Sequence, residues 1–167
     1  QHLIFSAVFY AIPTLLEHHL KNQWHFYLPI MIFSFLLAVP FIIYGEKKKK
    51  LKQVFIITIS NIAISTAVLF GIHSSLFLIG LLLFLYFISF NALEACLPSS
   101  VTKVVNPNAK GTAMGVYSMS QFLGFFVGGT MSGWLFQHYG VEVIFISLSC
   151  ISLIWLGIVI KGMQIKQ

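Results

Sequence analysis

The stretch "KGTAMGVYSMSQFLGFFVGGTMSGW", residues 110–134, combines the length and apolar character of a membrane-spanning helix with six glycines. An interior glycine costs a helix on the order of 1 kcal/mol relative to alanine, so another interaction must offset this loss. Small residues recur here every four positions in two rows, one formed by Gly124, Gly128 and Ser132 and the other by Gly129 and Gly133. Because small residues at this spacing let two helix backbones approach closely in lipid, we predict that these glycines pack the helix against a neighbour.

The rest of the chain has the composition of a membrane protein. Of its 167 residues, 58% are hydrophobic and only 8% are charged, whereas about a quarter of the residues in an average soluble domain are charged. A soluble domain of this size could not hide so many large apolar side chains from water. The formal charge of +6 comes with ten lysines and no arginine, so bidentate contacts to bases and phosphates are missing. We therefore expect the lipid bilayer as a partner and no nucleic acid.

Six apolar segments approach the roughly 20 residues that a helix needs to cross the hydrocarbon core. They lie at residues 1–18, 24–45, 53–73, 76–98, 111–137 and 141–161. The first begins without an initiator methionine, a basic n-region or a cleavage site, so we expect a clipped span rather than a signal peptide. The alternating stretches of about ten residues that are typical of β-barrels are absent. The prediction is an all-α polytopic fragment, residues 1–167, forming one six-helix bundle with a truncated first helix.

The lysines fix the expected orientation of this bundle. Only Lys21 lies on one side of the predicted spans, and nine lysines lie on the other: Lys47, Lys48, Lys49, Lys50, Lys52, Lys103, Lys110, Lys161 and Lys166. Positive residues are enriched on the cytoplasmic side, so we expect residues 46–52, "EKKKKLK", and the C-terminus to be cytoplasmic. The lysine run could be only this orientation signal, or it could also attract anionic lipid or act as a conformational latch.

Two sets of polar residues interrupt the spans. The first span carries a stripe at three- or four-residue spacing, formed by His2, Ser6, Tyr10, Thr14 and Glu17. Such a stripe lies on one helix face, where it either lines a water-filled pathway or bonds to neighbouring helices. In the fifth span, Tyr117 and Gln121 continue the face of Gly124 and Gly128, so they either face a cavity or accompany pure packing. Among these residues His2 is the strongest candidate for a functional role, because imidazole titrates near neutral pH.

Glu94 is the only acidic residue inside the apolar part of a span, and such a residue is by default a functional-site hypothesis. It lies four residues before Pro98, about one turn from the expected end of its span. Three roles remain open: it snorkels to the surface, it forms an ion pair with Lys103 or Lys110, or it binds a proton. Asn91, one turn earlier, is placed to hydrogen-bond to it.

Signatures of enzymes and metal sites are missing from the sequence. There is no GxSxG, Walker or CxxC motif, and "EHH" at residues 17–19 lacks the one-turn spacing of HExxH. Cys96 and Cys150 lie within apolar runs, where we expect buried, unreactive thiols. We therefore expect a protein that is not an enzyme and that holds no metal.

Residues 90–135, "FNALEACLPSSVTKVVNPNAKGTAMGVYSMSQFLGFFVGGTMSGWL", resemble the tenth and eleventh helices of major facilitator superfamily transporters, most closely the YajR-type inner-membrane transport proteins. Residues 39–55 resemble the eighth helix and its basic loop, and the whole chain corresponds to helices seven to twelve. The resemblance implies a partner six-helix N-terminal bundle, a central pathway with alternating access, a small-molecule substrate, and the proton gradient as energy source in place of any cofactor. It also implies that the third and sixth spans face lipid.

The resemblance assigns the candidate residues to parts of a transporter. The expected pathway residues are His2, Ser6, Tyr10, Thr14, Asn91, Glu94, Tyr117 and Gln121. Glu46 and Lys47 match a degenerate acidic–basic pair in the loop after helix eight, whereas the proline of the antiporter motif has no counterpart here. The soluble C-terminal domain of YajR-type proteins is absent or has been cut off.

The sequence thus predicts the C-terminal half of a proton-coupled efflux transporter, a multi-pass protein of the inner (plasma) membrane. The alternative is a non-transporting membrane scaffold or assembly subunit that uses its glycine faces only to bind other helices.

Overall fold

The computed structural model describes residues 1–17, 20–48, 50–71 and 75–162, and all regular structure in them is helical. In chain order the elements are α1 (His2–Glu17), α2 (Trp24–Lys47), α3 (Leu51–Gly71), α4 (Leu76–Val104), the short 3₁₀ helix η1 (Pro107–Ala109), α5 (Lys110–Tyr139) and α6 (Val141–Gly162). The predicted all-α fold is confirmed.

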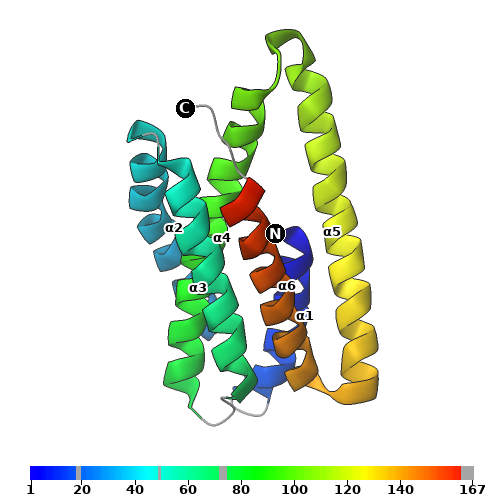
Figure 1. Cartoon of the computed structure of the whole chain (residues 1–167). Coiled ribbons are helices and arrows are strands. Elements are labelled where there is room, and N and C mark those ends of the chain that lie inside the picture. The colour runs from blue at the N-terminus through cyan, green and yellow to red at the C-terminus, as the bar shows by residue number, and fades with distance from the viewer. Residues whose placement is uncertain (18–19, 49, 72–74, 163–167) are drawn as a thin grey trace.

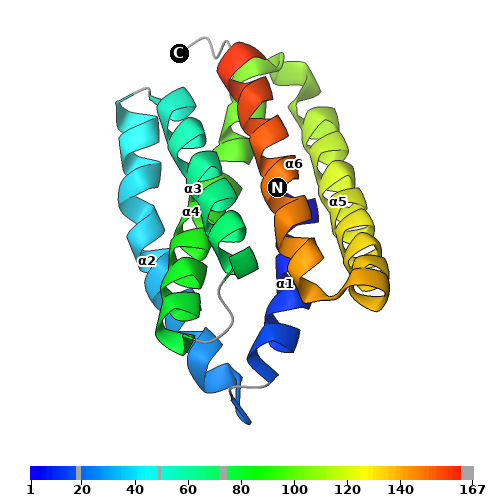
Figure 2. The same cartoon turned by 60° about the horizontal axis from the view of Figure 1, so that its bottom comes forward.

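The helices run alternately up and down in one bundle (Figure 1). We call the end where α2 and α4 finish and α3 and α5 begin the lysine end, because Lys47, Lys103 and Lys110 lie there. The connections from α1 to α2, from α3 to α4 and from α5 to α6 lie at the opposite end. Helix α1 covers only the half of the bundle next to that opposite end, so its first residues lie near mid-height in both side views (Figures 1 and 2).

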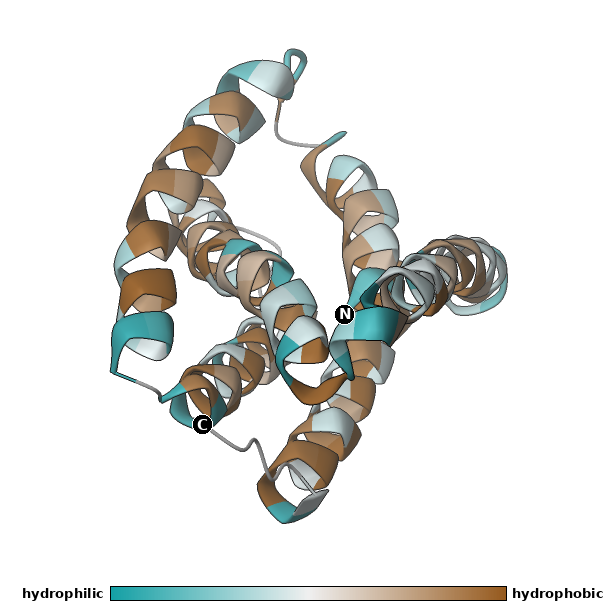
Figure 3. Ribbon diagram, turned by 90° about the horizontal axis from the view of Figure 1, so that it is seen from above, coloured by the Kyte–Doolittle hydropathy of each residue, from teal (hydrophilic) through white to brown (hydrophobic). Residues whose placement is uncertain are grey.

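Four helices of the described residues are long and apolar enough to cross a membrane: α2, α3, α4 and α6. Helix α1 is apolar but has only 16 residues. Helix α5 has 30 residues, but its glycines and polar side chains lower its hydropathy, and it does not meet the same criterion. Seen from above, hydrophobic residues cover most of the helical surface and hydrophilic residues concentrate toward helix ends and around the N-terminus (Figure 3).

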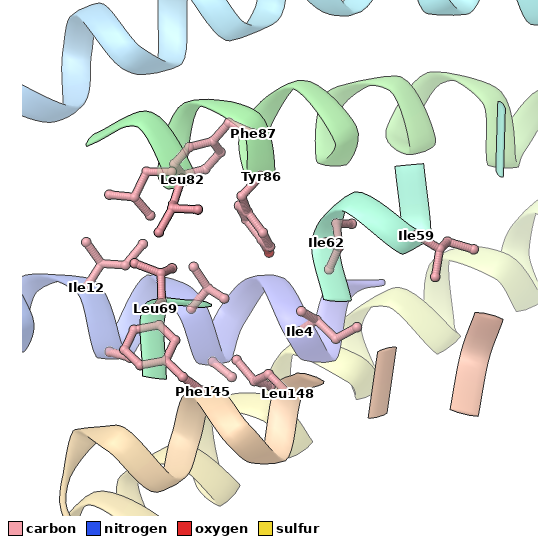
Figure 4. Close-up of a cluster of buried hydrophobic side chains, with 14 of the residues drawn as sticks. Ile4, Ile12, Ile59, Ile62, Leu69, Leu82, Tyr86, Phe87, Phe145 and Leu148 are labelled. Carbon is pink, nitrogen blue, oxygen red and sulfur yellow. The ribbon is translucent and has the colours of Figure 1, made fainter. Parts of the chain in front are cut away.

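The core lies where α1, α3, α4 and α6 meet. Helix α3 packs most extensively on α6, α1 on α5, and α2 on α4. Figure 4 shows Leu82 and Tyr86 of α4 directed toward α1, with Phe145 of α6 on the other side of that helix. The Tyr86 and Phe145 side chains are almost completely buried. In lipid such contacts stabilise the bundle through van der Waals packing, since lipid tails are as apolar as the side chains.

One expectation about exposure is corrected, and another stays a prediction. The lipid-facing position expected for the third and sixth spans stays a prediction, because it depends on which helices a partner bundle would cover. Within this bundle half of the apolar segment of α3 and 33% of that of α6 are buried, against 11% for α2. In α5 only Gly128 and Ser132 are buried. Cys96 is buried as predicted, whereas Cys150 is exposed, because it lies on the outer side of α6.

Helix α4 extends six residues beyond the end of the predicted span, through Pro98 to Val104. Proline lacks an N–H and cannot bond to the carbonyl four residues back, which here is that of Glu94. The helix nevertheless continues to Val104, and beyond the proline the Ser100 hydroxyl donates to the Cys96 carbonyl at 2.8 Å. Glu94 therefore lies ten residues before the helix end, or about 15 Å rather than one turn.

Candidate functional site

The site begins with the contact between α1 and the glycine row of α5. A Cβ atom built on Gly128 would lie 2.2 Å from both the Leu3 carbonyl oxygen and the Ser6 hydroxyl, and one on Gly124 would lie 3.1 Å from the Leu3 nitrogen. The backbone of α1 therefore occupies the space that a side chain would need. Close approach of this kind is what small residues permit between membrane helices.

The second glycine row does not take part in this contact. None of the described residues places an atom within 4 Å of a Cβ built on Gly129 or Gly133. These positions follow Gly128 and Ser132 by one residue, which turns them about 100° around the helix axis and away from α1. Within the described residues, Gly124 and Gly128 pack against α1, while the helix packing predicted for Gly129 and Gly133 stays a prediction.

The glycine contact brings the start of α1 against polar residues of α4 and α5. We call the resulting group the polar cluster; it comprises Gln1, His2, Glu94, Tyr117 and Gln121. The His2 Nε2 atom lies 3.3 Å from Glu94 Oε2 and 3.1 Å from Gln121 Nε2. The Gln121 amide also donates to Glu94 Oε1 and to the Tyr117 hydroxyl, both at 3.3 Å, and the Gln1 amide donates to Glu94 Oε2 at 3.0 Å. Three helices thus meet at one carboxylate.

The histidine and the glutamate of the polar cluster differ in exposure. The His2 side chain is 9% exposed and the Glu94 side chain is 41% exposed. A cavity of about 310 Å³ lies beside them, lined in part by His2, Tyr117, Ser120 and Gln121. The carboxylate is thus the more exposed of the two groups, and the imidazole is the one that lines this cavity.

Phenylalanine rings enclose the other side of the polar cluster. The ring centroids of His2 and Phe125 are 4.8 Å apart, and Phe5 stacks on Phe90 with centroids 4.3 Å apart. Apolar rings lower the local dielectric constant and strengthen the interaction between imidazole and carboxylate. Nothing in the sequence marked these three rings among the 17 phenylalanines, and Gln1 was likewise not among the predicted residues.

The expected partners of Glu94 are corrected. Lys103 pairs with Glu46 of α2, whose other carboxylate oxygen accepts a hydrogen bond from the Ser99 hydroxyl at 2.7 Å. Lys110 begins α5, eleven residues before Gln121, which is about 16 Å along the helix and too far to reach the polar cluster. The Asn91 amide donates to Ser34 at 3.4 Å instead of to Glu94.

The match of Glu46 and Lys47 to a family motif stays a prediction, but their placement in a loop is corrected. Both residues belong to the last turn of α2, and neighbouring residues on a helix do not face each other. The ion pair between Glu46 and Lys103 instead joins the ends of α2 and α4.

The remaining predicted pathway residues lie outside the polar cluster. The Ser6 hydroxyl donates to the Leu3 carbonyl at 3.3 Å, next to Gly128. The Tyr10 ring contacts Phe136, with centroids 6.0 Å apart, and the Thr14 hydroxyl donates to the Tyr10 carbonyl at 3.4 Å. Among the described residues, no group of three or more His, Cys, Asp or Glu side chains is arranged to hold a metal ion.

Comparisons with known proteins agree with this architecture. The sequence profile of the Major Facilitator Superfamily matches residues 2–162. The chain is 36% identical over 160 residues to "Inner membrane transport protein YajR" of Escherichia coli (strain K12), covering 94% of the chain and 35% of that protein. An uncharacterized transporter of Buchnera aphidicola subsp. Acyrthosiphon pisum is 35% identical over 130 residues, covering 76% of the chain and 33% of the relative. The chain thus spans about a third of the length of these relatives.

Proposed function

Because the chain belongs to the Major Facilitator Superfamily, we propose that it forms the C-terminal half of a proton-coupled efflux transporter of the inner membrane. The observation that carries this proposal is the contact between His2 and Glu94, 3.3 Å apart near mid-height of the bundle. Ionisable residues at this depth are costly in a membrane and mark ion or substrate pathways.

The chemistry of the polar cluster suits proton coupling. An ionised Glu94 only accepts hydrogen bonds, whereas a protonated carboxyl group also donates one. Gln1, His2 and Gln121 all present nitrogen atoms to this carboxylate. Protonation would leave the amide contacts weaker, since hydrogen bonds to a charged acceptor are roughly twice as strong as neutral ones. The change would alter the contacts among α1, α4 and α5 and bias the position of one half of the transporter against the other.

An N-terminal six-helix bundle is the proposed partner of this half. Helix α5 exposes most of its residues in the described structure, yet its composition is not that of the four apolar spans. If lipid covered every exposed side of α5, the polar groups of this helix would have no hydrogen-bond partners there, which is unfavourable. A second bundle covering α5 and the sparsely buried α2 would enclose a pathway for a small-molecule substrate between the halves, as in other secondary transporters. No bound cofactor is needed in this scheme.

The lysine end is proposed to be cytoplasmic. Lys52, Lys103 and Lys161 come from three helices but share this end of the bundle, whereas Lys21 lies between α1 and α2 at the opposite end. The positive-inside tendency then places the end of α6 and the residues after it in the cytoplasm.

The alternative function is a non-transporting scaffold or assembly subunit. The open row of Gly129 and Gly133 favours it, because small residues without an internal partner could receive a helix of another protein.

Cysteine labelling separates the two functions without knowledge of the substrate. Ser120 lines the cavity beside the polar cluster, and its hydroxyl donates to the backbone carbonyls of Val116 and Tyr117 on its own helix rather than to a side chain of the cluster. Ser120→Cys, in a background lacking Cys96 and Cys150, should react with a membrane-impermeant thiol reagent at a rate that depends on the imposed pH gradient. Adding Glu94→Gln should remove this dependence. Ile158→Cys on the exposed side of α6 is the lipid-facing control. Equal and pH-independent protection at both positions would contradict transport and favour the scaffold.

A further inference from the structure

Helices α1 and α2 diverge from the end at which they are connected (Figures 2 and 3). Helix α2 packs mainly on α4, which leaves space between α1 and α2. Two cavities occupy this space, one of about 440 Å³ that begins at Trp24 and one of about 380 Å³ that reaches Asn91. Both are lined by Met31 and Ile32, so they adjoin each other along the helices, and we call them together the α1–α2 groove.

The α1–α2 groove is long and apolar. Its lining on α2 extends from Trp24 to Leu36, about 18 Å at the rise of an α-helix. Apart from the Tyr27 hydroxyl, its polar side chains stand at the two ends. Gln23 is at one end, where its amide donates to the Pro13 carbonyl at 3.0 Å, and Asn91 is at the other. The shape suits an extended hydrocarbon body rather than a compact polar solute.

The inner end of the groove adjoins the polar cluster. Phe90 lines the groove and precedes Glu94 by one helical turn on α4. The Gln1 amide bonds to both residues, at 3.2 Å from the Phe90 carbonyl and 3.0 Å from the Glu94 carboxylate. A molecule whose tail lies in the groove would therefore have its head beside this carboxylate.

The charge beside the inner end of the groove determines which kind of head group can bind there. Glu94 is 41% exposed, whereas its partner His2 is 9% exposed and enclosed by phenylalanines. The other three acidic residues of the chain lie at helix ends: Glu17, Glu46 and Glu142. The accessible charge inside the bundle is thus negative, and the aromatic faces nearby also attract cations.

We propose that the α1–α2 groove holds the elongated apolar tail of a monocationic amphiphile whose head group lies beside Glu94. The proposal rests on the transport function above and names the substrate class for it. The amphiphile would enter from the end of the groove at Trp24, which lies on the side opposite the lysine end.

Binding to the protein in lipid nanodiscs tests the proposal. The probe is tritiated dodecyltrimethylammonium, and binding to empty nanodiscs is subtracted to remove partitioning into lipid. We expect saturable binding that laurate, with a comparable tail and opposite charge, does not displace. Butyltrimethylammonium should compete at least about a hundredfold more weakly, because each buried methylene strengthens binding by about fourfold.

Two variants and one matched control locate the site. Ile32→Trp fills the shared middle of the groove and should weaken dodecyltrimethylammonium binding about tenfold while leaving the weak butyl analogue unchanged. Phe33→Trp changes the adjacent residue, which is 60% exposed and lines neither cavity, and should have no effect. Glu94→Gln should weaken binding about tenfold or more, the factor for losing one contact to a charged group.

Three results would overturn the proposal: no saturable binding above empty nanodiscs, equal competition by laurate, or equal effects of Ile32→Trp and Phe33→Trp. The first is also the result expected if bilayer acyl chains fill the groove. The pH-dependent labelling of Ser120→Cys, measured on the same preparation, reports on the transport function separately. If labelling responds to pH and binding fails, only the substrate class is rejected; if binding succeeds and labelling is constant, only transport is rejected.

Discussion

Replacing Gly128 by alanine tests the contact that builds the site. The added methyl group would lie 2.2 Å from the Leu3 carbonyl oxygen, and this backbone atom cannot rotate away as a side chain can. Helix α1 must move outward by more than 1 Å to reach ordinary contact distance, a case of overpacking that costs about 1–3 kcal/mol. The substitution also gains about 1 kcal/mol of helix propensity. We expect a net loss of up to about 2 kcal/mol in the free energy of unfolding.

Gly129→Ala is the matched control, because it gains the same propensity and none of the described residues lies within 4 Å of the new methyl group. Gly124→Ala, at 3.1 Å from the Leu3 nitrogen, should fall between the two. Unfolding in mixed micelles, followed by circular dichroism, gives the three free energies. Equal stability of the Gly128 and Gly129 variants would refute the claim that α1 and α5 are in backbone contact. The Gly128 variant should also label faster at Ser120→Cys, because His2 moves away from Gln121.

Other predictions concern the polar contacts of α3 and α4. Glu94→Gln should leave the free energy of unfolding within about 1 kcal/mol of the wild-type value, because an amide retains part of the hydrogen bonding. Substrate-driven proton movement into proteoliposomes should be lost, and normal proton movement would exclude the carboxylate from coupling. A double-mutant cycle of Glu46→Gln and Lys103→Ala should give a coupling energy of only about 0.2–1 kcal/mol, because both side chains are partly exposed. A coupling energy above about 2 kcal/mol would contradict this and show a stronger, desolvated ion pair. Asn61 donates to the Leu85 carbonyl at 2.7 Å and to Ser89 at 2.8 Å, so Asn61→Leu should destabilise by about 0.6–1.7 kcal/mol, and an unchanged denaturation midpoint would contradict this.

The sequence was sufficient for the helical fold because long apolar runs alternate along it with short connections that hold most of the charged residues and turn formers. It also placed Gln121 and Tyr117 on the face of Gly124, since that relation depends only on the 3.6-residue period of one helix. It could not choose between the two glycine rows, because both have the same spacing and only the position of α1 decides between them.

Contacts between helices were the least predictable part of the site. Lys103 is close to Glu94 along the chain, but on the folded helix Glu46 of α2 is its partner. The contact of His2 with Glu94 joins residues 92 positions apart, and no local pattern encodes such a distance. The end of α4 was misjudged because Pro98 is a common helix terminator, whereas the helix continues to Val104.

Pro98 interrupts the backbone hydrogen bonding of α4 between the polar cluster and the contact with α2. On one side of it lies Glu94, whose carbonyl lacks its usual helical partner at this proline. On the other side lie Ser99, which donates a hydrogen bond to Glu46 at the end of α2, and Lys103, which forms an ion pair with it. Bending is easiest where a helix has lost a backbone bond. If Glu94 takes up a proton as proposed, the protonated carboxyl group would lie beside this weakened point of α4, and the segment beyond Pro98 that binds α2 would be the part that moves.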